Sequence, residues 1–132
     1  MRFVAVAVGG MIGSLSRWWI EELLPGPPLG FPWATFVVNV SGAFALGVIG
    51  SMLLERAFRW PHWRAFLGIG VIGSFTTFST MALDGVRLAD AGMASTALLF
   101  WIGTLLLGQI MALAGMRLGR TNPVRRRHEA DR

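Results

Sequence analysis

Hydroxyl side chains are concentrated in one apolar stretch of this sequence, between Gly68 and Met81. Five of them fall within seven consecutive positions and follow three glycines: the hydroxyls are Ser74, Thr76, Thr77, Ser79 and Thr80, and the glycines are Gly68, Gly70 and Gly73. Such hydroxyls offer the backbone hydrogen bonds that compete with those of a helix. A helix interrupted inside a membrane presents freed carbonyls to cations and amide groups to anions. The stretch therefore predicts an ion site.

Close helix packing is the alternative interpretation of the same stretch, because Gly, Ser and Thr also let membrane helices approach each other. A close-packed face favours small side chains, whereas Phe75 and Phe78 are set among these hydroxyls. The two bulky rings favour the ion site over packing alone.

Four apolar segments are long enough to cross a bilayer as helices. Hydrophobic residues make up 54% of the 132 residues, and the charged residues lie at the ends of the apolar runs. The first segment is preceded by a single arginine, Arg2, and has no convincing cleavage site, so a signal peptide is not expected. We expect one domain, an all-α membrane protein with four transmembrane helices at about residues 3–24, 33–54, 65–89 and 91–116, the third broken at the midplane, followed by a charged tail at 117–132.

Composition excludes several classes of site. The chain has no cysteine, and His62 and His128 both fall in polar flanks, so neither a thiolate metal site nor an intramembrane imidazole site is expected. The net charge is +5 and every basic residue is an arginine. Arginines just outside apolar spans, such as those at 125–127, are typical of contact with lipid head groups rather than nucleic acid. No nucleophile–base pair lies within the spans, so an enzyme is not expected.

Two polar residues inside or at the edge of the spans each have two interpretations. Asn39 shares one helical face with Thr35 and Gly42, and its amide could donate to an anion or bond a neighbouring helix. Arg17 precedes two tryptophans near the end of the first span. It is either a snorkelling interfacial arginine or a vestibule cation that attracts anions.

The remaining features concern packing and pairing. Small residues at Gly9 and Gly13, and again at Ala43, Gly47 and Ser51, predict close helix contacts. Glu21 or Glu22 is a candidate partner for Arg17, and Asp84 is either another candidate or an ordinary charge at a helix end. Trp101 lies in the middle of the fourth span, where the interfacial belt of tryptophans does not explain it.

Three motifs, in order on four spans, resemble those of the CrcB/Fluc fluoride channels. They are Gly9-Gly10-x-x-Gly13-x-x-x-Arg17, Thr35-Phe-Val-Val-Asn39-Val-Ser-Gly42-x-Phe44 and Gly73-Ser-Phe-Thr76-Thr-Phe78-Ser-Thr80. The resemblance runs from Gly9 to about Gly108. It implies a fluoride-selective channel that exports cytoplasmic fluoride passively across the plasma (inner) membrane of a bacterium. It also implies an antiparallel, dual-topology homodimer.

The same resemblance implies the site residues. A central structural Na⁺ would be bound by the backbone carbonyls of Gly73 and Thr76 from both subunits. The fluoride pore would use the Asn39 amide, the Phe78 ring edge and the hydroxyls of Thr77, Ser79, Thr80 and Thr104. Arg17 corresponds to the vestibule arginine. A polar track on the fourth helix would pass Phe100, Thr104 and Gly108. The family's second pore phenylalanine is Met81 here, and a thioether has no aromatic edge.

Arginine placement raises a question about orientation. Arg2, the arginines of residues 55–64 and the tail fall on one side, against Arg17 and Arg87 on the other. The positive-inside rule then predicts cytoplasmic termini, whereas an antiparallel homodimer needs both orientations. Either the tail has little influence, or the partner is an oppositely oriented homologue in a heterodimer.

Two other function classes are compatible with four short spans. A small multidrug-type, proton-coupled transporter needs a carboxylate in the middle of its first helix, whereas Glu21 and Glu22 lie at the helix end. A non-transporting membrane assembly protein would explain the glycines but leave Asn39 and the hydroxyl cluster without a role.

Overall fold

The computed structural model describes residues 1–27, 29–54 and 61–120. These residues form helices and no strand: α1 (Arg2–Leu23), α2 (Trp33–Leu54), α3 (Pro61–Arg64), the π-helix η1 (Ala65–Ile72), α4 (Gly73–Phe75), α5 (Phe78–Asp90) and α6 (Ala94–Arg120). We refer to α3, η1, α4 and α5 together as the third span. Four stretches are long and apolar enough to cross a membrane: α1, α2, the third span and α6. The predicted all-α fold with four spans is confirmed.

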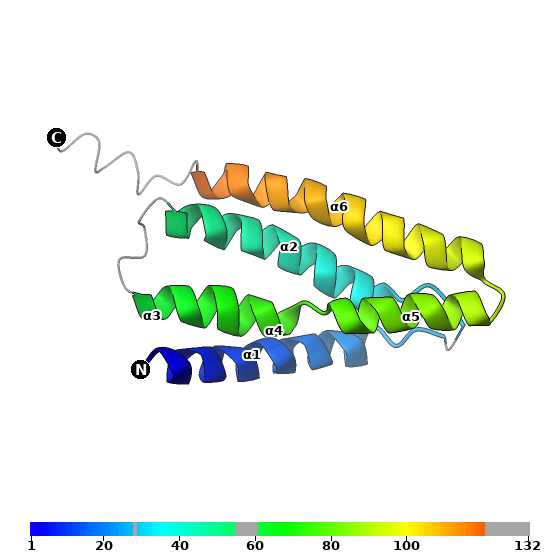
Figure 1. Cartoon of the computed structure of the whole chain (residues 1–132), viewed down its shortest axis with the longest axis horizontal. Helices are drawn as coiled ribbons and strands as arrows, with labels where there is room; N and C mark the ends of the chain where they lie inside the picture. Colours follow the sequence, from blue (N-terminus) through cyan, green and yellow to red (C-terminus); the bar gives the residue numbers. More distant parts are fainter. Residues whose placement is uncertain (28, 55–60, 121–132) are drawn as a thin grey trace.

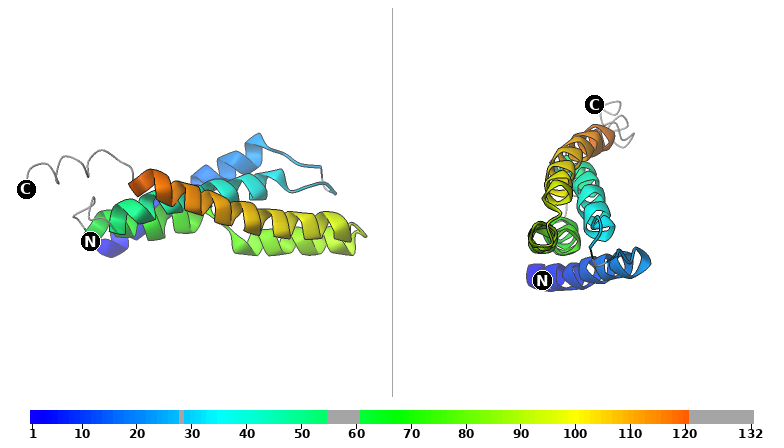
Figure 2. Two further views of the ribbon diagram at one scale, coloured as in Figure 1. Left: turned by 90° about the horizontal axis from the view of Figure 1, so that it is seen from above. Right: turned by 90° about the vertical axis from the view of Figure 1, so that its right-hand side faces the viewer.

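Two close helix pairs build the bundle (Figure 1). In the first pair, α1 packs on η1, where a side chain on Gly9 or Gly13 would collide with the Phe66 or Val71 carbonyl. In the second, α2 packs on α6, where a side chain on Gly47 would collide with the Ala112 carbonyl. Both predicted small-residue stripes therefore lie at helix contacts. Figure 2 shows the two pairs as successive layers, joined through the third span.

The last two spans depart from the predicted boundaries. The third span begins at Pro61 rather than 65, and its first half is π-helical. The span predicted at 91–116 begins at Ala94, because α5 ends in a turn in which Gly92 has φ 79° and the Met93 N–H donates to the Leu88 carbonyl. It continues to Arg120, so the first four residues of the charged tail predicted at 117–132 are helical, although Gly119 is a weak helix former. The remainder of the tail, 121–132, lies outside the described residues.

Large apolar side chains cover most of the outer surface. They include residues from all four spans, such as Phe3, Leu46, Ile69 and Leu106, all more than a third exposed. A surface this apolar is unfavourable in water and suits lipid or another protein. None of the buried side-chain nitrogens and oxygens among the described residues lacks a hydrogen-bond partner. The buried polar groups of the described residues therefore find their hydrogen-bond partners within the chain, whereas the outer surface is too apolar to suit water.

Candidate functional site

The third span is interrupted at Thr76 and Thr77. Both have extended backbones, with φ, ψ of −74°, 152° and −142°, 117°. The Thr77 hydroxyl accepts a hydrogen bond from the Thr80 N–H at 3.1 Å, so Thr77 is the N-cap of α5. It also donates to the Thr80 hydroxyl at 2.9 Å. The hydroxyl cluster thus forms the start of a new helix instead of continuing the old one.

Asn39 on α2 holds this interruption by a reciprocal pair of hydrogen bonds. Its amide nitrogen donates to the Thr77 carbonyl and its amide oxygen accepts from the Thr77 N–H, each at 2.9 Å. The two interpretations of Asn39 from sequence are therefore not exclusive. One N–H bonds the neighbouring segment, and the second N–H makes no hydrogen bond to a described residue. Asn39 also lies on the surface groove described below.

Two backbone carbonyls are released by these bonds. In a continuous helix the Gly73 carbonyl would accept from the Thr77 N–H, and the Thr76 carbonyl from the Thr80 N–H. Here the first donor bonds to Asn39 and the second to the Thr77 hydroxyl. Gly73 and Thr76 are the two residues whose carbonyls are predicted to bind a central cation, and oxygen ligands of this kind suit a hard cation.

An open groove runs along α2, the interruption, α5 and α6. Its volume is about 350 Å³. We call it the α2–α6 groove, and its lining residues are Asn39, Ala43, Thr76, Thr77, Phe78, Met81, Thr104, Leu105, Gly108, Gln109 and Ala112. Residues far apart in the sequence thus meet at one surface, because the α2–α6 contact places the middle of α6 beside the interruption.

Five of the predicted pore residues line the groove: Asn39, Thr77, Phe78, Met81 and Thr104. Ser79 and Thr80, also predicted for the pore, do not line it. Phe78 is 76% exposed, which is unusual for a phenylalanine beside polar groups, whereas Met81 is only 6% exposed. The ring at position 78 is available to a partner or a permeating species, and the thioether at 81 is part of the interior.

The contribution of α6 differs from the prediction in detail. The Thr104 hydroxyl donates to the Phe100 carbonyl of its own helix at 2.6 Å. Phe100 is fully buried against Phe31, edge to face at 5.6 Å between ring centroids, and does not line the groove. Gln109 does line it, and its position one residue off the predicted helical track is why the sequence did not assign it a role.

Trp101 has a structural role that the sequence left unexplained. Its indole Nε1–H donates to the Met81 carbonyl at 3.2 Å, and its ring fills the space that a side chain on Gly85 would need. The indole N–H of a half-buried tryptophan needs such an acceptor. Trp101 therefore joins α6 to the first turns of α5, next to Phe78.

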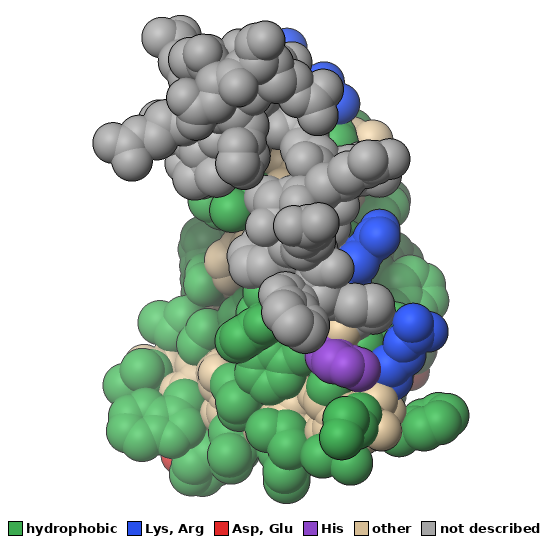
Figure 3. Space-filling model, turned by 90° about the vertical axis from the view of Figure 1, so that its left-hand side faces the viewer, with side chains coloured by type: hydrophobic (Ala, Val, Ile, Leu, Met, Phe, Trp, Pro, Cys, Tyr) green, Lys and Arg blue, Asp and Glu red, His purple; other side chains and the backbone are tan. Residues whose placement is uncertain are grey.

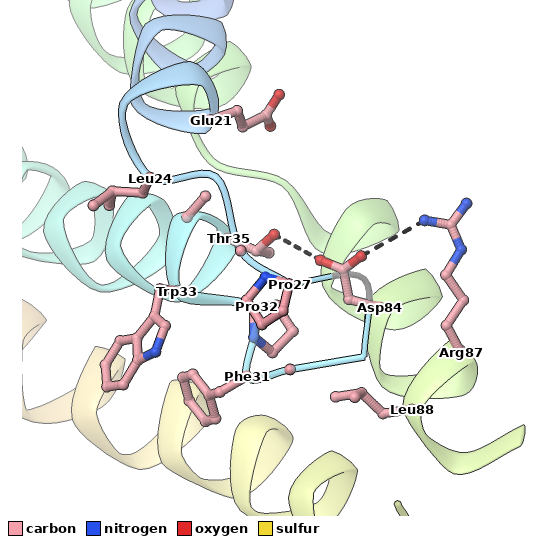
Figure 4. Close-up of a pocket in the computed structure, with 13 residues that line it drawn as sticks. Glu21, Leu24, Pro27, Phe31, Pro32, Trp33, Thr35, Asp84, Arg87 and Leu88 are labelled. Atoms are coloured by element: carbon pink, nitrogen blue, oxygen red, sulfur yellow. Dashed lines mark hydrogen bonds and ion pairs between the residues drawn. The ribbon is translucent and has the colours of Figure 1, made fainter. Parts of the chain in front are cut away.

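A second cavity, of about 220 Å³, lies where α1 ends and α2 begins. The Asp84 carboxylate lies between two partners, Thr35 and Arg87 (Figure 4). The Thr35 hydroxyl donates to it at 2.7 Å, and a guanidinium nitrogen of Arg87 is 4.0 Å away. Arg17 pairs instead with Glu21, at 3.8 Å. Of the pairings considered from sequence, Arg17–Glu21 is confirmed and Arg17–Asp84 is not formed.

Comparison with known proteins identifies the family. The family model for CrcB-like protein, Camphor Resistance (CrcB), matches residues 4–116. The chain belongs to the CrcB family. The resemblance seen in the three sequence motifs is therefore confirmed over nearly the whole transmembrane part.

Curated relatives cover the same region. A fluoride-specific ion channel FluC of Thermus thermophilus is 41% identical over 119 residues, 89% of this chain and 94% of the relative. Fluoride-specific ion channel FluC 2 of Nocardia farcinica is 43% identical over 116 residues, 88% and 80% respectively. The FluC of Paracoccus denitrificans is 37% identical over 118 residues, 89% of this chain and 94% of the relative. Together with the four membrane-length helices, the family makes this chain a multi-pass membrane protein. Its relatives are named as channels, not enzymes.

Proposed function

We propose that the chain is one subunit of a fluoride-selective ion channel that lets cytoplasmic fluoride leave a bacterium across its plasma membrane. The observation that supports this most directly is the α2–α6 groove, where Asn39, the helix interruption and the exposed Phe78 ring meet. The relatives named as fluoride-specific channels match this chain across all of these elements. The multidrug transporter and the assembly protein considered from sequence gain no support from the family.

The groove forms one wall of a pore, and a second subunit supplies the other. Within the described residues, the two close helix pairs leave the groove open to the outside along its length instead of enclosing it as a conduit. A phenylalanine that is 76% exposed beside this opening is suited to a protein interface. We therefore propose an antiparallel dimer in which fluoride passes along the interface between subunits.

Fluoride is small and strongly hydrated, so the pore must replace its water with hydrogen-bond donors. The second Asn39 N–H and the Thr80 hydroxyl proton are not used in hydrogen bonds to described residues, although Thr80 does not line the groove of one subunit. The edge of the Phe78 ring carries positive partial charge. The start of α5 adds the positive end of a helix dipole. We assign Thr77 and Thr104 to the pore wall, with Met81 as a buried support. Ser79 is also assigned to the pore, although, like Thr80, it does not line the groove of one subunit.

The released carbonyls of Gly73 and Thr76 fit a central sodium ion. Carbonyls of both residues from two subunits would hold it in place of its water shell, and the interruption lies where the third span is proposed to reach the membrane midplane. The bound cation would supply positive charge that offsets the cost of bringing an anion into the membrane. Asn39 has the supporting task of keeping the Thr77 N–H away from the Gly73 carbonyl.

Two further points of the proposal concern the role of Arg17 and the driving force for fluoride. Arg17 lies near the end of α1, 30% exposed at its side chain and beside Glu21, where it would attract anions to a vestibule. Flow requires no energy source, because fluoride leaves a cell down its own gradient. The direction of net flow then depends on the gradient alone.

Fluoride efflux from liposomes tests the proposal. Purified protein is reconstituted into vesicles loaded with potassium fluoride, valinomycin is added, and external fluoride is followed with an electrode; vesicles loaded with potassium chloride are the control. We expect fast fluoride release without chloride release. Reconstitution from detergent admits both orientations of the chain, so the assay does not depend on how cells insert it. Folded, reconstituted protein that releases no fluoride would contradict the proposed function.

A further inference from the structure

The polar side chains of the α2–α6 groove differ in whether their donor protons are free. These side chains are Asn39, Thr76, Thr77, Thr104 and Gln109. All three hydroxyls donate within the chain, at distances of 3.0, 2.9 and 2.6 Å; the acceptors are the Ile72 carbonyl, the Thr80 hydroxyl and the Phe100 carbonyl. An anion can only accept hydrogen bonds, so hydroxyls bonded in this way offer it no proton.

The two amides of the groove, in contrast, keep free donors. Asn39 uses one N–H on the Thr77 carbonyl and has one left. Gln109 makes no hydrogen bond to a described residue, so both of its N–H groups are free. Within residues 1–27, 29–54 and 61–120, Asn39 and Gln109 are the only side-chain amides, and both line the groove. Gln109 therefore supplies most of the free side-chain N–H groups of the groove.

Gln109 lies in the middle of α6, which is an unusual place for an exposed amide. Its neighbours on the outer surface of α6, such as Leu106 and Ile110, are large apolar side chains. Charged side chains of the described residues lie near the ends of the spans, and Figure 3 looks onto one of these ends, where arginine side chains are visible. An unpaired amide is unfavourable in lipid, so a polar residue at this depth indicates a polar partner.

Gln109 lies about one helical turn beyond Asn39 along the groove. Gly108 packs beside Ala43, which follows Asn39 by four residues on α2. The other residues that line this part of the groove, Ala43, Gly108 and Ala112, contribute no side-chain donor. An anion that leaves Asn39 in the direction of the α6 C-terminus therefore meets Gln109 as its next side-chain donor.

We propose that Gln109 binds fluoride in the pore and is the residue through which α6 contacts the ion. This inference rests on the proposed function. It gives Gln109 the donor role that the sequence predicted for Thr104, whose proton is held by the Phe100 carbonyl. Asn39 and Gln109 then form two successive amide stations, the first at the helix interruption and the second nearer the α6 C-terminus.

Gln109→Met is the direct test, because methionine keeps the length and flexibility of the side chain but has no donor. We expect fluoride efflux from liposomes to fall at least about tenfold, which corresponds to the loss of one hydrogen bond to a charged group. The variant should elute like the wild type in size-exclusion chromatography. Unchanged efflux would overturn the proposal. Loss of assembly would also overturn it and assign the amide to packing between subunits.

Moving the amide separates a donor from a structural group. In the Gln109→Met background, Leu105→Gln returns an amide to the groove one helical turn away, since Leu105 also lines it. Leu106→Gln in the same background is the matched control, because Leu106 is exposed on α6 but lies outside the groove. We expect Leu105→Gln to restore most of the efflux and Leu106→Gln to restore none. Equal efflux from the two double variants would contradict the proposal.

The wild type distinguishes failure of this inference from failure of the proposed function. Assembled wild-type protein that releases no fluoride from liposomes contradicts the channel itself. Wild-type protein that conducts, together with a Gln109→Met variant that conducts equally well, contradicts the role of Gln109 and leaves the channel in place.

Discussion

The third span and α6 have similar composition but different continuity. Both are apolar and rich in glycine, and both contain threonine near the middle. Yet α6 is one helix from Ala94 to Arg120, whereas the third span has two extended residues between α4 and α5. A glycine followed by a threonine in the middle of a span, as at Gly103 and Thr104, is therefore not sufficient to interrupt a membrane-length helix.

The difference lies in what each threonine can bond. Thr104 donates to the Phe100 carbonyl four residues earlier, which leaves its helix intact. Thr77 faces Asn39 on α2, whose amide oxygen accepts the Thr77 N–H in place of the Gly73 carbonyl, and whose amide nitrogen donates to the Thr77 carbonyl. A helix in an apolar medium can be interrupted only where other groups satisfy its backbone. The comparison teaches that α2 creates the interruption in the third span.

The largest effect expected from this comparison is on transport, at Phe78. Phe78→Ile should abolish fluoride efflux from liposomes, because the exposed ring at the interruption supplies the positive edge for the ion, while the protein remains assembled in size-exclusion chromatography. Phe3→Ile is the matched control, since Phe3 is also exposed but lies at the far start of α1. Loss of assembly in Phe78→Ile would instead assign the ring to interface packing.

Removing the replacement hydrogen bonds should have the next largest effect. Asn39→Ala loses both bonds to Thr77, and interhelical hydrogen bonds in membrane proteins average about 0.6 kcal/mol and reach about 1.7. We expect the free energy of unfolding in detergent to fall by about 1–3 kcal/mol, and fluoride efflux to fall with it. Ser41→Ala, which removes a hydroxyl bonded only within α2, is the control. Equal stability of Asn39→Ala and wild type would refute the role of α2 in the interruption.

The smallest expected effect is on the free energy of unfolding, in a direct comparison of Thr77 with Thr104. Thr77→Val should lower the free energy of unfolding by about 1 kcal/mol, because it removes the N-cap of α5. Thr104→Val should change it by less than about 0.5 kcal/mol, since its hydroxyl bonds only its own helix. Thr77→Ser keeps the capping oxygen and should restore most of the loss. Equal losses for the two valine variants in chemical unfolding would mean that both hydroxyls contribute alike.

Part of the site could be predicted because its signals are local. A glycine stripe, a cluster of hydroxyls and an asparagine in an apolar span are each visible within one helix, and they placed Asn39, Thr77 and Phe78 among the candidates. Pairings between helices could not be predicted in the same way. Asp84 bonds Thr35 rather than Arg17, and Trp101 bonds the Met81 carbonyl, because these partners come from different spans.

By itself, the sequence determined four membrane-length spans and the faces on which small residues allow close packing, because both depend on the length and periodicity of apolar runs. It also pointed to the CrcB family through three motifs. Only the tertiary structure decided that Asn39 holds Thr77, that Gly73 and Thr76 release their carbonyls, and that Arg17 pairs with Glu21 while Asp84 accepts from Thr35. Hydrogen bonds and ion pairs act over a few ångströms, so they follow from which helices lie side by side and not from order along the chain.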